Sequence, residues 1–212
     1  MSYYPVFLNL EDKSCVVIGG GAVAERKILA LLDAGASVRV ISPDVTGKIA
    51  ALGAGGTIKH EARVYRDGDL KGAFLVIAAT SDMEVNRKVF QEARDIPVNV
   101  VDVPELCSFI VPSVIKRGPL VIAISTSGVS PALSKTIREE LEGLYSEELE
   151  QVLDFMENVR KRIKDKGIDP DRRAEIFKKI GSSETLKILR NSGYGGVKDF
   201  VRVILRRERI EL

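Results

Sequence analysis

Short apolar segments alternate with amphipathic stretches through the first half of the chain. Each segment is rich in Val and Ile and apolar at nearly every position, which is typical of strands buried on both faces. The segments that we expect to be strands are residues 14–18, 37–41, 57–60, 74–78 and 98–101. The stretches between them predict helices over 23–35, 44–52 and 82–95, the first ending on Gly35. This alternation predicts a Rossmann-like, doubly wound α/β domain with a parallel sheet, over residues 1–112.

The pattern changes in the second half. A further strand is expected over 120–125, followed by a helix with Ser130 as its N-cap and Pro131 at its first position. After residue 146 only helical patterns remain, over 146–166, 170–180 and 197–207, separated by KGIDP, IGSSE and NSGYGG. We therefore expect a small helical C-terminal domain over 147–212, with a connecting segment, 113–146, that supplies a subunit interface.

Composition and charge narrow the class of protein. With 212 residues, 45% of them hydrophobic, the chain is too apolar to be disordered and long enough for one or two cores. Residues 160–212 hold 16 Lys or Arg against 8 Asp or Glu, whereas residues 1–159 hold 16 against 22. A basic C-terminal third indicates either an acidic partner, such as a nucleic acid, a membrane surface or a polycarboxylate, or simply solvated helix faces.

Several site types and compartments receive no support from the sequence. Cys15, Cys107 and the single His60 lack the spacing of metal ligands, so we expect no metal site. Two cysteines without such spacing suit a reducing compartment. The first residues lack a signal-peptide pattern, and no apolar run approaches the roughly 20 residues of a membrane span. The expectation is a soluble cytoplasmic protein that binds neither membrane nor nucleic acid.

A glycine-rich turn gives the first indication of a ligand. Gly19, Gly21 and Ala24 form G-x-G-x-x-A between a predicted strand and a predicted helix. In a dinucleotide site the first glycine makes the tight turn, the second admits a pyrophosphate, and the small third residue packs the helix on the strand. The phosphates then lie at the positive end of the helix. A glycine turn with a purely structural role is the alternative.

The end of the second predicted strand suggests which dinucleotide binds. Ser42, Pro43 and Asp44 follow that strand, and Asp44 lies about 20 residues beyond the turn, where an acid bonds a ribose 2′-hydroxyl and repels a 2′-phosphate. This favours NAD over NADP. Asp44 as the cap of the next helix is the alternative, and Arg39 keeps NADP open.

Further polar residues follow the fourth and fifth predicted strands. Thr80 and Ser81 are placed to line the nicotinamide ribose, unless they only cap the next helix. Asn99 and Asp102 are expected in the crevice at the carboxyl ends of the strands. A carboxylate there accepts a proton if partial burial raises its pKa, so Asp102 is the candidate acid/base residue. An aspartate before Val-Pro is also ordinary turn chemistry.

Two stretches of the chain resemble the precorrin-2 dehydrogenase family of sirohaem biosynthesis, including the N-terminal module of multifunctional sirohaem synthases. They are GGGAVAERK and NVVDVPELCSFIVPSVIKRGPLVIAISTSGVSPALSKTIRE. The resemblance is close over residues 4–144, and beyond 146 only helical character and length agree. It implies a homodimer, joined through 113–146, that uses NAD to oxidise precorrin-2 to sirohydrochlorin. It also implies that the helical domain closes over the tetrapyrrole.

The resemblance also implies roles for individual residues. It assigns NAD binding to the glycine turn with Ala22 and Val23, and to the region of Pro43 and Asp44, while Asp102 matches the family's functional aspartate. The residues that it implies for the substrate cleft, to which we add Asn99, are Ser125, Thr126, Ser127 and Gly128.

The expected substrate suits the chemistry of the chain. Precorrin-2 carries eight carboxylates, which the basic C-terminal third is able to pair with Arg and Lys. Three alternatives remain open. The chain is a bifunctional enzyme that also inserts ferrous iron, a chelatase whose nucleotide site is vestigial, or a non-enzymatic NAD-sensing or nucleic-acid-binding module.

Overall fold

The structure is a computed structural model that describes residues 3–210. The chain divides into two compact units, Met1–Val111 and Pro112–Leu212. Each unit has its own hydrophobic core, and each is described by itself.

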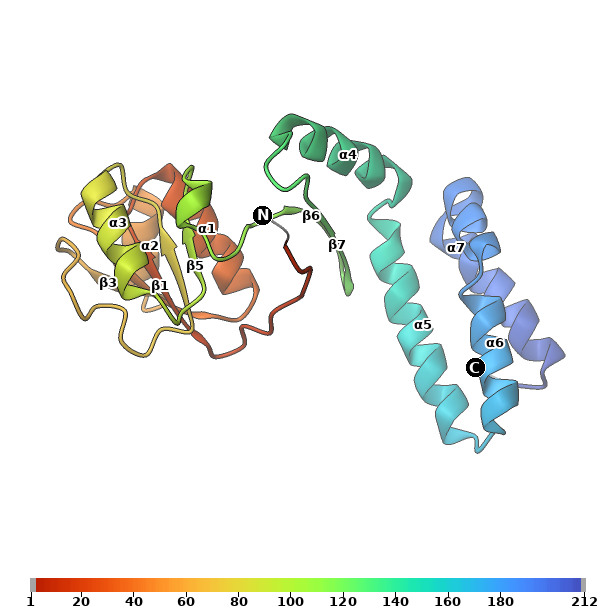
Figure 1. The fold of residues 1–212 in the computed structure, drawn as a ribbon. Coiled ribbons are helices and arrows are strands. Elements are labelled where there is room, and N and C mark those ends of the chain that lie inside the picture. The colour runs from red at the N-terminus through yellow and green to blue at the C-terminus, as the bar shows by residue number, and fades with distance from the viewer. Residues whose placement is uncertain (1–2, 211–212) are drawn as a thin grey trace. The chain divides into compact units, whose positions relative to one another are not determined.

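The first unit is built on a parallel sheet (Figure 1), whose strand order is β3-β2-β1-β4-β5. Its strands are β1 (Ser14–Ile18), β2 (Ser37–Ile41), β3 (Lys59–Glu61), β4 (Leu75–Ala78) and β5 (Val98–Val100). The helices between them are α1 (Ala22–Asp33), α2 (Gly47–Ala54) and α3 (Met83–Glu92), and a short 3₁₀ turn, η1 (Pro104–Leu106), follows β5. The doubly wound α/β fold predicted from the sequence is confirmed, with the strand order reversing between β1 and β4. In folds of this type ligands bind at that reversal, outside the carboxyl ends of the strands.

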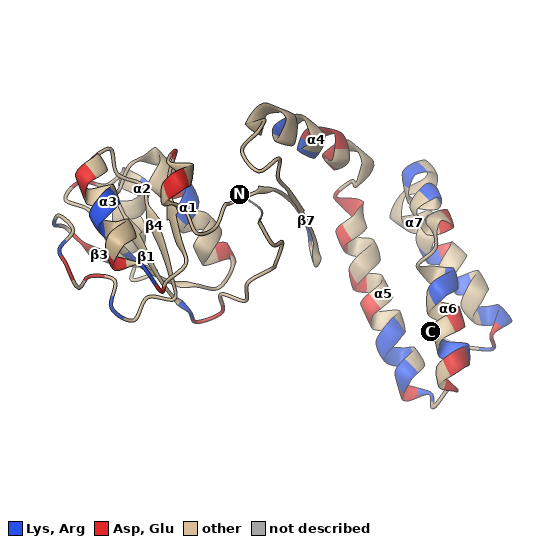
Figure 2. Ribbon diagram, in the orientation of Figure 1, with Lys and Arg blue, Asp and Glu red and all other residues tan. Residues whose placement is uncertain are grey.

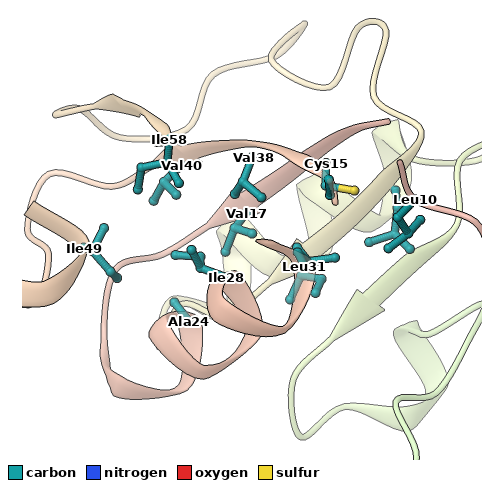
Figure 3. Close-up of a cluster of buried hydrophobic side chains, with 13 residues drawn as sticks. Leu10, Cys15, Val17, Ala24, Ile28, Leu31, Val38, Val40, Ile49 and Ile58 are labelled. Carbon is teal, nitrogen blue, oxygen red and sulfur yellow. The ribbon is translucent and has the colours of Figure 1, made fainter. Parts of the chain in front are cut away.

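The central strand β1 contributes side chains to the hydrophobic clusters on both faces of the sheet. Val17 belongs to a cluster with Ala24 and Ile28 of α1 (Figure 3). Val16 and Ile18 belong to a second cluster on the other face, which includes Val89 of α3. Successive side chains of a strand point to opposite faces, so a run of apolar residues serves two cores at once.

The second unit combines a β-hairpin with a helical region. Its elements are β6 (Ser113–Arg117), β7 (Leu120–Ile124), α4 (Pro131–Leu144), α5 (Glu148–Asp165), α6 (Pro170–Ile180) and α7 (Ser183–Arg207). The predicted start of α4 is confirmed, because the Ser130 side chain accepts a hydrogen bond from the Leu133 N–H, at 3.2 Å, and Pro131 is the first helical residue. Strand β6 was not predicted. It pairs antiparallel with β7, and its last two residues, Lys116 and Arg117, interrupt the apolar pattern.

The prediction that NSGYGG separates two helices is confirmed, because the range of α7 consists of two helices that meet at a kink at Gly193. Only Gly193, with φ 64°, leaves the helical conformation inside α7. The carboxylate of Glu148, at the start of α5, accepts a hydrogen bond from the Tyr194 N–H, at 2.8 Å. Leu189 before the break and Val197 after it are buried in the same core. A partner for the freed backbone group and continuous packing therefore keep the two halves together.

In residues 3–210 we find no helix that is both long and apolar enough to cross a membrane.

Candidate active site

The turn between β1 and α1 requires glycine for two reasons. Gly19 has φ 112°, a conformation that L-residues with side chains rarely adopt. A β-carbon at Gly19 would lie 2.3 Å from the Ala79 carbonyl oxygen, and one at Gly20 would lie 2.2 Å from the Asp44 carbonyl oxygen. The backbone beyond β4 and the backbone beyond β2 thus close on this turn from two sides. The first glycine makes the tight turn, as predicted.

Gly21 faces open space instead. A β-carbon at Gly21 would meet no heavy atom of residues 3–210 within 4 Å. Gly21 is the N-cap of α1 and, as a glycine, has no side chain with which to cap this helix end. The N–H groups of the first turn, together with the positive end of the helix dipole, therefore favour an anion.

The remaining residues of the G-x-G-x-x-A motif complete the candidate phosphate cradle, which is the turn at Gly19 and Gly21 with the start of α1. Ala24 is fully buried in the cluster that joins α1 to the sheet, the packing role expected of the third small residue. Ala22 is exposed and Val23 is half-buried in the first turn of α1. These residues fit a dinucleotide pyrophosphate, since the turn is tight, the helix end is uncapped, and the space above Gly21 is open.

The three residues after β2 differ in exposure. Ser42 is buried and its hydroxyl donates to the Asp44 carbonyl oxygen, at 2.7 Å, while Pro43 and Asp44 are exposed. The alternative role of Asp44 as a helix cap is wrong, because Thr46 caps α2 by accepting from the Ile49 N–H at 3.3 Å. The Asp44 carboxylate is thus not committed to capping α2.

Arg39, which kept NADP open, lies within a network of ion pairs. Its guanidinium lies 3.4 Å from Glu61 Oε1 and donates to the Asp69 carbonyl oxygen. Neighbouring Arg63 contacts both carboxylate oxygens of Asp69, at 2.7 Å each, and pairs with Glu61. The hydrogen bond from Arg63 lowers the pKa of Asp69. Both arginines are therefore occupied by acids of the same unit.

The loop after β4 is organised by short-range hydrogen bonds. Thr80 Oγ1 accepts from the Asp82 N–H at 2.8 Å, and Asp82 caps α3. Ser81 is exposed. Asn86 of α3, a position not predicted from the sequence, is buried and donates its amide to the Thr80 carbonyl oxygen at 3.0 Å. The only sequence signal for it was one asparagine on an otherwise apolar helix face.

The turn after β5 carries Asp102. The Val103 N–H donates to the Val100 carbonyl oxygen at 3.2 Å, closing a four-residue turn, and Asp102 occupies its third position with φ 62°. The Val101 N–H donates to the Ala78 carbonyl oxygen at 2.9 Å, so the turn begins beside the end of β4. Asp102 therefore lies at the carboxyl edge of the sheet, as predicted.

Electrostatics link Asp102 to helix α1. Burial and neighbouring Arg26 lower the pKa of Lys27, and the Asp102 carboxylate acts in the opposite direction. Lys27 lies in the helix that starts at the glycine turn. The candidate acid/base residue and the candidate phosphate cradle thus belong to one edge of the unit.

Asn99 is directed toward the chain itself. Its side chain is buried, and the amide nitrogen donates to the Phe109 carbonyl oxygen at 3.0 Å and lies 3.5 Å from Cys107 Sγ. This donor holds the segment that returns along β5. A role of Asn99 in binding substrate stays a prediction.

The four remaining predicted residues form the loop between β7 and α4 in the second unit. Thr126 Oγ1 anchors the loop by accepting from the Ser130 N–H, at 3.0 Å, and from the Ser134 hydroxyl, at 3.1 Å. Ser127 and Gly128 are exposed and left-handed, with φ 53° and 84°, and the Ser125 hydroxyl accepts from the Ser127 N–H at 3.0 Å. The anchored loop thus presents exposed hydroxyl and backbone groups.

Across the described residues, no group of three or more His, Cys, Asp and Glu side chains is arranged to hold a metal ion.

Comparison with known proteins identifies the family. Residues 6–113 match the family model described as "Putative NAD(P)-binding", and residues 117–144 match "Sirohaem biosynthesis protein central". A solved structure described as "SirC, precorrin-2 dehydrogenase" superposes with a TM-score of 0.83 at 30% identity, over 96% of this chain and 100% of that chain. The chain belongs to the precorrin-2 dehydrogenase family. The resemblance seen in the sequence is confirmed.

Curated relatives extend the family to longer proteins. The siroheme synthase of Methylobacillus flagellatus is 46% identical over 166 residues, which are 77% of this chain and 36% of that protein. Siroheme synthase 1 of Aeromonas salmonicida is 41% identical over 188 residues, which are 88% of this chain and 40% of that protein. The chain therefore spans about two fifths of the length of these relatives.

Proposed function

We propose that this member of the precorrin-2 dehydrogenase family oxidises precorrin-2 to sirohydrochlorin with NAD as the electron acceptor. The observation that carries the proposal is the open, uncapped start of α1 at Gly21, on the same sheet edge as Asp102. Bound NAD would supply the hydride acceptor. The residues proposed to hold it are Gly19, Gly21, Ala22, Val23, Ala24, Ser42, Pro43, Asp44, Thr80 and Ser81.

Asp102 is the proposed acid/base residue. The oxidation removes two electrons as a hydride and leaves one proton to be taken up for each hydride lost. The Asp102 carboxylate is placed at the sheet edge to accept that proton at an Oδ atom and pass it to water. NAD is favoured over NADP because Arg39 of β2 and Arg63 are both paired with Glu61.

The second unit supplies groups for a polycarboxylate. Figure 2 shows helix α5 with acidic residues at its start and basic residues at its end, and α6 also ends on lysines. Arg and Lys at such positions pair with substrate carboxylates. The loop of Ser125, Thr126, Ser127 and Gly128, with its exposed groups, is the proposed second contact with the tetrapyrrole.

A second copy of the chain is the proposed partner of the β6–β7 hairpin. One face of the hairpin exposes Val114 and Val121, at 44% and 36% of their full accessible surface. A two-stranded sheet is at best marginally stable alone, so further strands on its edges or a cover on this face would stabilise it. Val114→Glu combined with Val121→Glu should convert a dimer into a monomer, as measured by light scattering after gel filtration.

The activity is tested by anaerobic incubation of the purified chain with precorrin-2 and either NAD or NADP. Sirohydrochlorin is followed by its absorbance, and ferrous iron is added afterwards in the same cuvette. NAD-dependent formation of sirohydrochlorin supports the proposal. Oxidation that proceeds equally without NAD, or the absence of oxidation, contradicts it, and accelerated iron insertion would add a chelatase activity.

A further inference from the structure

A cysteine thiol contacts both ends of the turn that carries Asp102. Cys107 Sγ accepts a hydrogen bond from the Val100 N–H at 3.2 Å. The same sulfur lies 3.2 Å from the Val100 carbonyl oxygen and 3.3 Å from the Val103 carbonyl oxygen, within reach of its S–H. Val100 and Val103 are the first and last residues of the turn, so the thiol joins its two ends.

The turn needs this support because of the backbone at Asp102. A φ of 62° is left-handed, and the third position of such a turn normally holds glycine or asparagine. Asp adopts this conformation at a cost in free energy, and strained backbone of this kind persists where the surroundings over-determine it. The thiol contacts are part of those surroundings.

The segment after Cys107 is fixed to β5, which holds the sulfur in place. The Ser108 N–H donates to the Val98 carbonyl oxygen at 2.9 Å, and the Val98 N–H donates to the Ser108 hydroxyl at 2.8 Å. Asn99 completes the attachment through the Phe109 carbonyl oxygen. Burial raises the pKa of the Cys107 thiol, so it keeps the proton with which it donates.

We propose that Cys107 is a positioning residue, whose thiol clamps the turn from Val100 to Val103 and thereby holds the Asp102 carboxylate in its reactive orientation. This inference rests on the proposed function, since it gives Cys107 a role in the step assigned to Asp102. Sulfur suits the task because its size and long bond to carbon allow it to contact three backbone groups from one position.

The test begins with Cys107→Val, which keeps an apolar side chain of somewhat larger volume but removes the hydrogen bonds, together with Cys107→Ser, which keeps a donor and an acceptor. We expect Cys107→Val to lower kcat for precorrin-2 oxidation between about 10-fold and 100-fold, because small misplacements of a catalytic group are costly. The KM for NAD should stay unchanged, and Cys107→Ser should recover most of the loss. Cys15→Ala is the matched control, since Cys15 is the other free cysteine and lies buried in β1.

A double-mutant cycle separates positioning from general stability. Cys107→Val should cost nothing further in kcat when Asp102 is already Ala, because there is then no carboxylate to position. An equal loss in both backgrounds would overturn the inference, as would a folded Cys107→Val variant with unchanged kcat. If Cys107→Val does not fold, the same cycle is run with Cys107→Ala and judged by the same two outcomes.

Failure of the proposed function would be seen in the wild-type protein, which would then not oxidise precorrin-2. In that case the clamp is tested by the φ angle of Asp102 in the crystal structure of the Cys107→Val variant. Loss of the left-handed φ at Asp102 supports the clamp, and a turn with an unchanged backbone overturns it.

Discussion

Two turns at the carboxyl edge of the sheet reach a left-handed backbone by opposite means. Gly19, in the turn after β1, has φ 112°, and Asp102, in the turn after β5, has φ 62°. The first turn is shaped by the absence of side chains, which lets two neighbouring backbones approach and leaves the start of α1 open. The second turn keeps its side chain because the carboxylate is the group that it presents.

This difference corresponds to two proposed tasks, which are cofactor binding at the first turn and proton transfer at the second. A pyrophosphate is recognised by backbone N–H groups, so glycine serves it without conformational cost. In the proposed mechanism a side chain accepts the proton, so the second turn would bear the strain of an aspartate, and the thiol of Cys107 is proposed to hold it. The predictions below test whether the two turns are divided in this way.

The largest effect is expected from Asp102→Asn. Asparagine tolerates the left-handed backbone, so the fold should be unaffected, while the loss of the proton acceptor should lower kcat by about 10²- to 10⁴-fold. Steady-state kinetics with precorrin-2 measure kcat, and a titration measures the affinity for NADH. Unchanged kcat in a folded variant would remove Asp102 from the mechanism, and weakened NADH binding would show that the two turns are not independent.

The glycines of the first turn should divide into a structural and a binding position. Gly19→Ala places a β-carbon against the Ala79 carbonyl oxygen and forces an unfavourable φ, so we expect a loss of about 2–5 kcal/mol in the free energy of unfolding. Gly21→Ala should fold normally and weaken NADH binding by about tenfold or more, which corresponds to at least ~1.4 kcal/mol.

The matched control for this pair is Gly47→Ala at the start of α2. A β-carbon at Gly47 would also meet no heavy atom of the described chain within 4 Å. This variant should keep both stability and NADH affinity in denaturant unfolding and fluorescence titration. A Gly21→Ala variant that binds NADH like Gly47→Ala would refute the open space above Gly21 as the phosphate site.

A smaller effect, on stability, is expected from Asp102→Gly, which should lower kcat as Asp102→Asn does yet stabilise the fold. Relief of the left-handed strain favours the native state by about 1–2 kcal/mol, and the extra freedom of glycine in the unfolded chain offsets about 0.4–1 kcal/mol of it. Asp12→Gly is the control, since Asp12 has φ 57° and lies before β1. It should gain similar stability in thermal unfolding without losing activity. A destabilised Asp102→Gly would show that the Asp102 side chain itself supports the turn.

The smallest effect is a change in the titration of Lys27. Burial and Arg26 lower the pKa of Lys27 and the Asp102 carboxylate opposes them, so Asp102→Asn should lower it further. Because the folded pKa lies below the unfolded value of about 10.4, the unfolded chain binds more protons. The resulting destabilisation is present at low pH and is relieved as pH rises through the folded pKa of Lys27. An NMR titration of its side chain, assigned with Lys27→Met, measures the shift. An unchanged pKa would show that Asp102 has no electrostatic effect on Lys27 of α1.

Features encoded over a few residues were predictable from the sequence. The strands over 14–18 and 37–41, and the start of α4 at Ser130 and Pro131, depend on local apolar runs and capping chemistry. Strand β6 was missed because Lys116 and Arg117 break its apolar pattern, and its pairing depends on β7.

In the candidate site, too, only the residues with a local sequence pattern were predictable. Gly19, Gly21 and Asp102 are identified by a motif or by the position of a strand end. The roles of Asn86 and Cys107 arise only when their polar atoms meet backbone groups that the fold brings to them, at Thr80 and at Val100. Ordinary helix and turn residues carry no local pattern that announces such contacts.

The break at Gly193 bears on the order in which the second unit assembles. The Tyr194 N–H is bonded to Glu148, 46 positions earlier in the chain, so one amide of α7 depends on a long-range contact. Contacts between distant residues form more slowly than those within a helix. We expect the part of α7 after Gly193 to be stabilised only once α5 is present. The two helices that meet at Gly193 would then form separately and pack together late in folding.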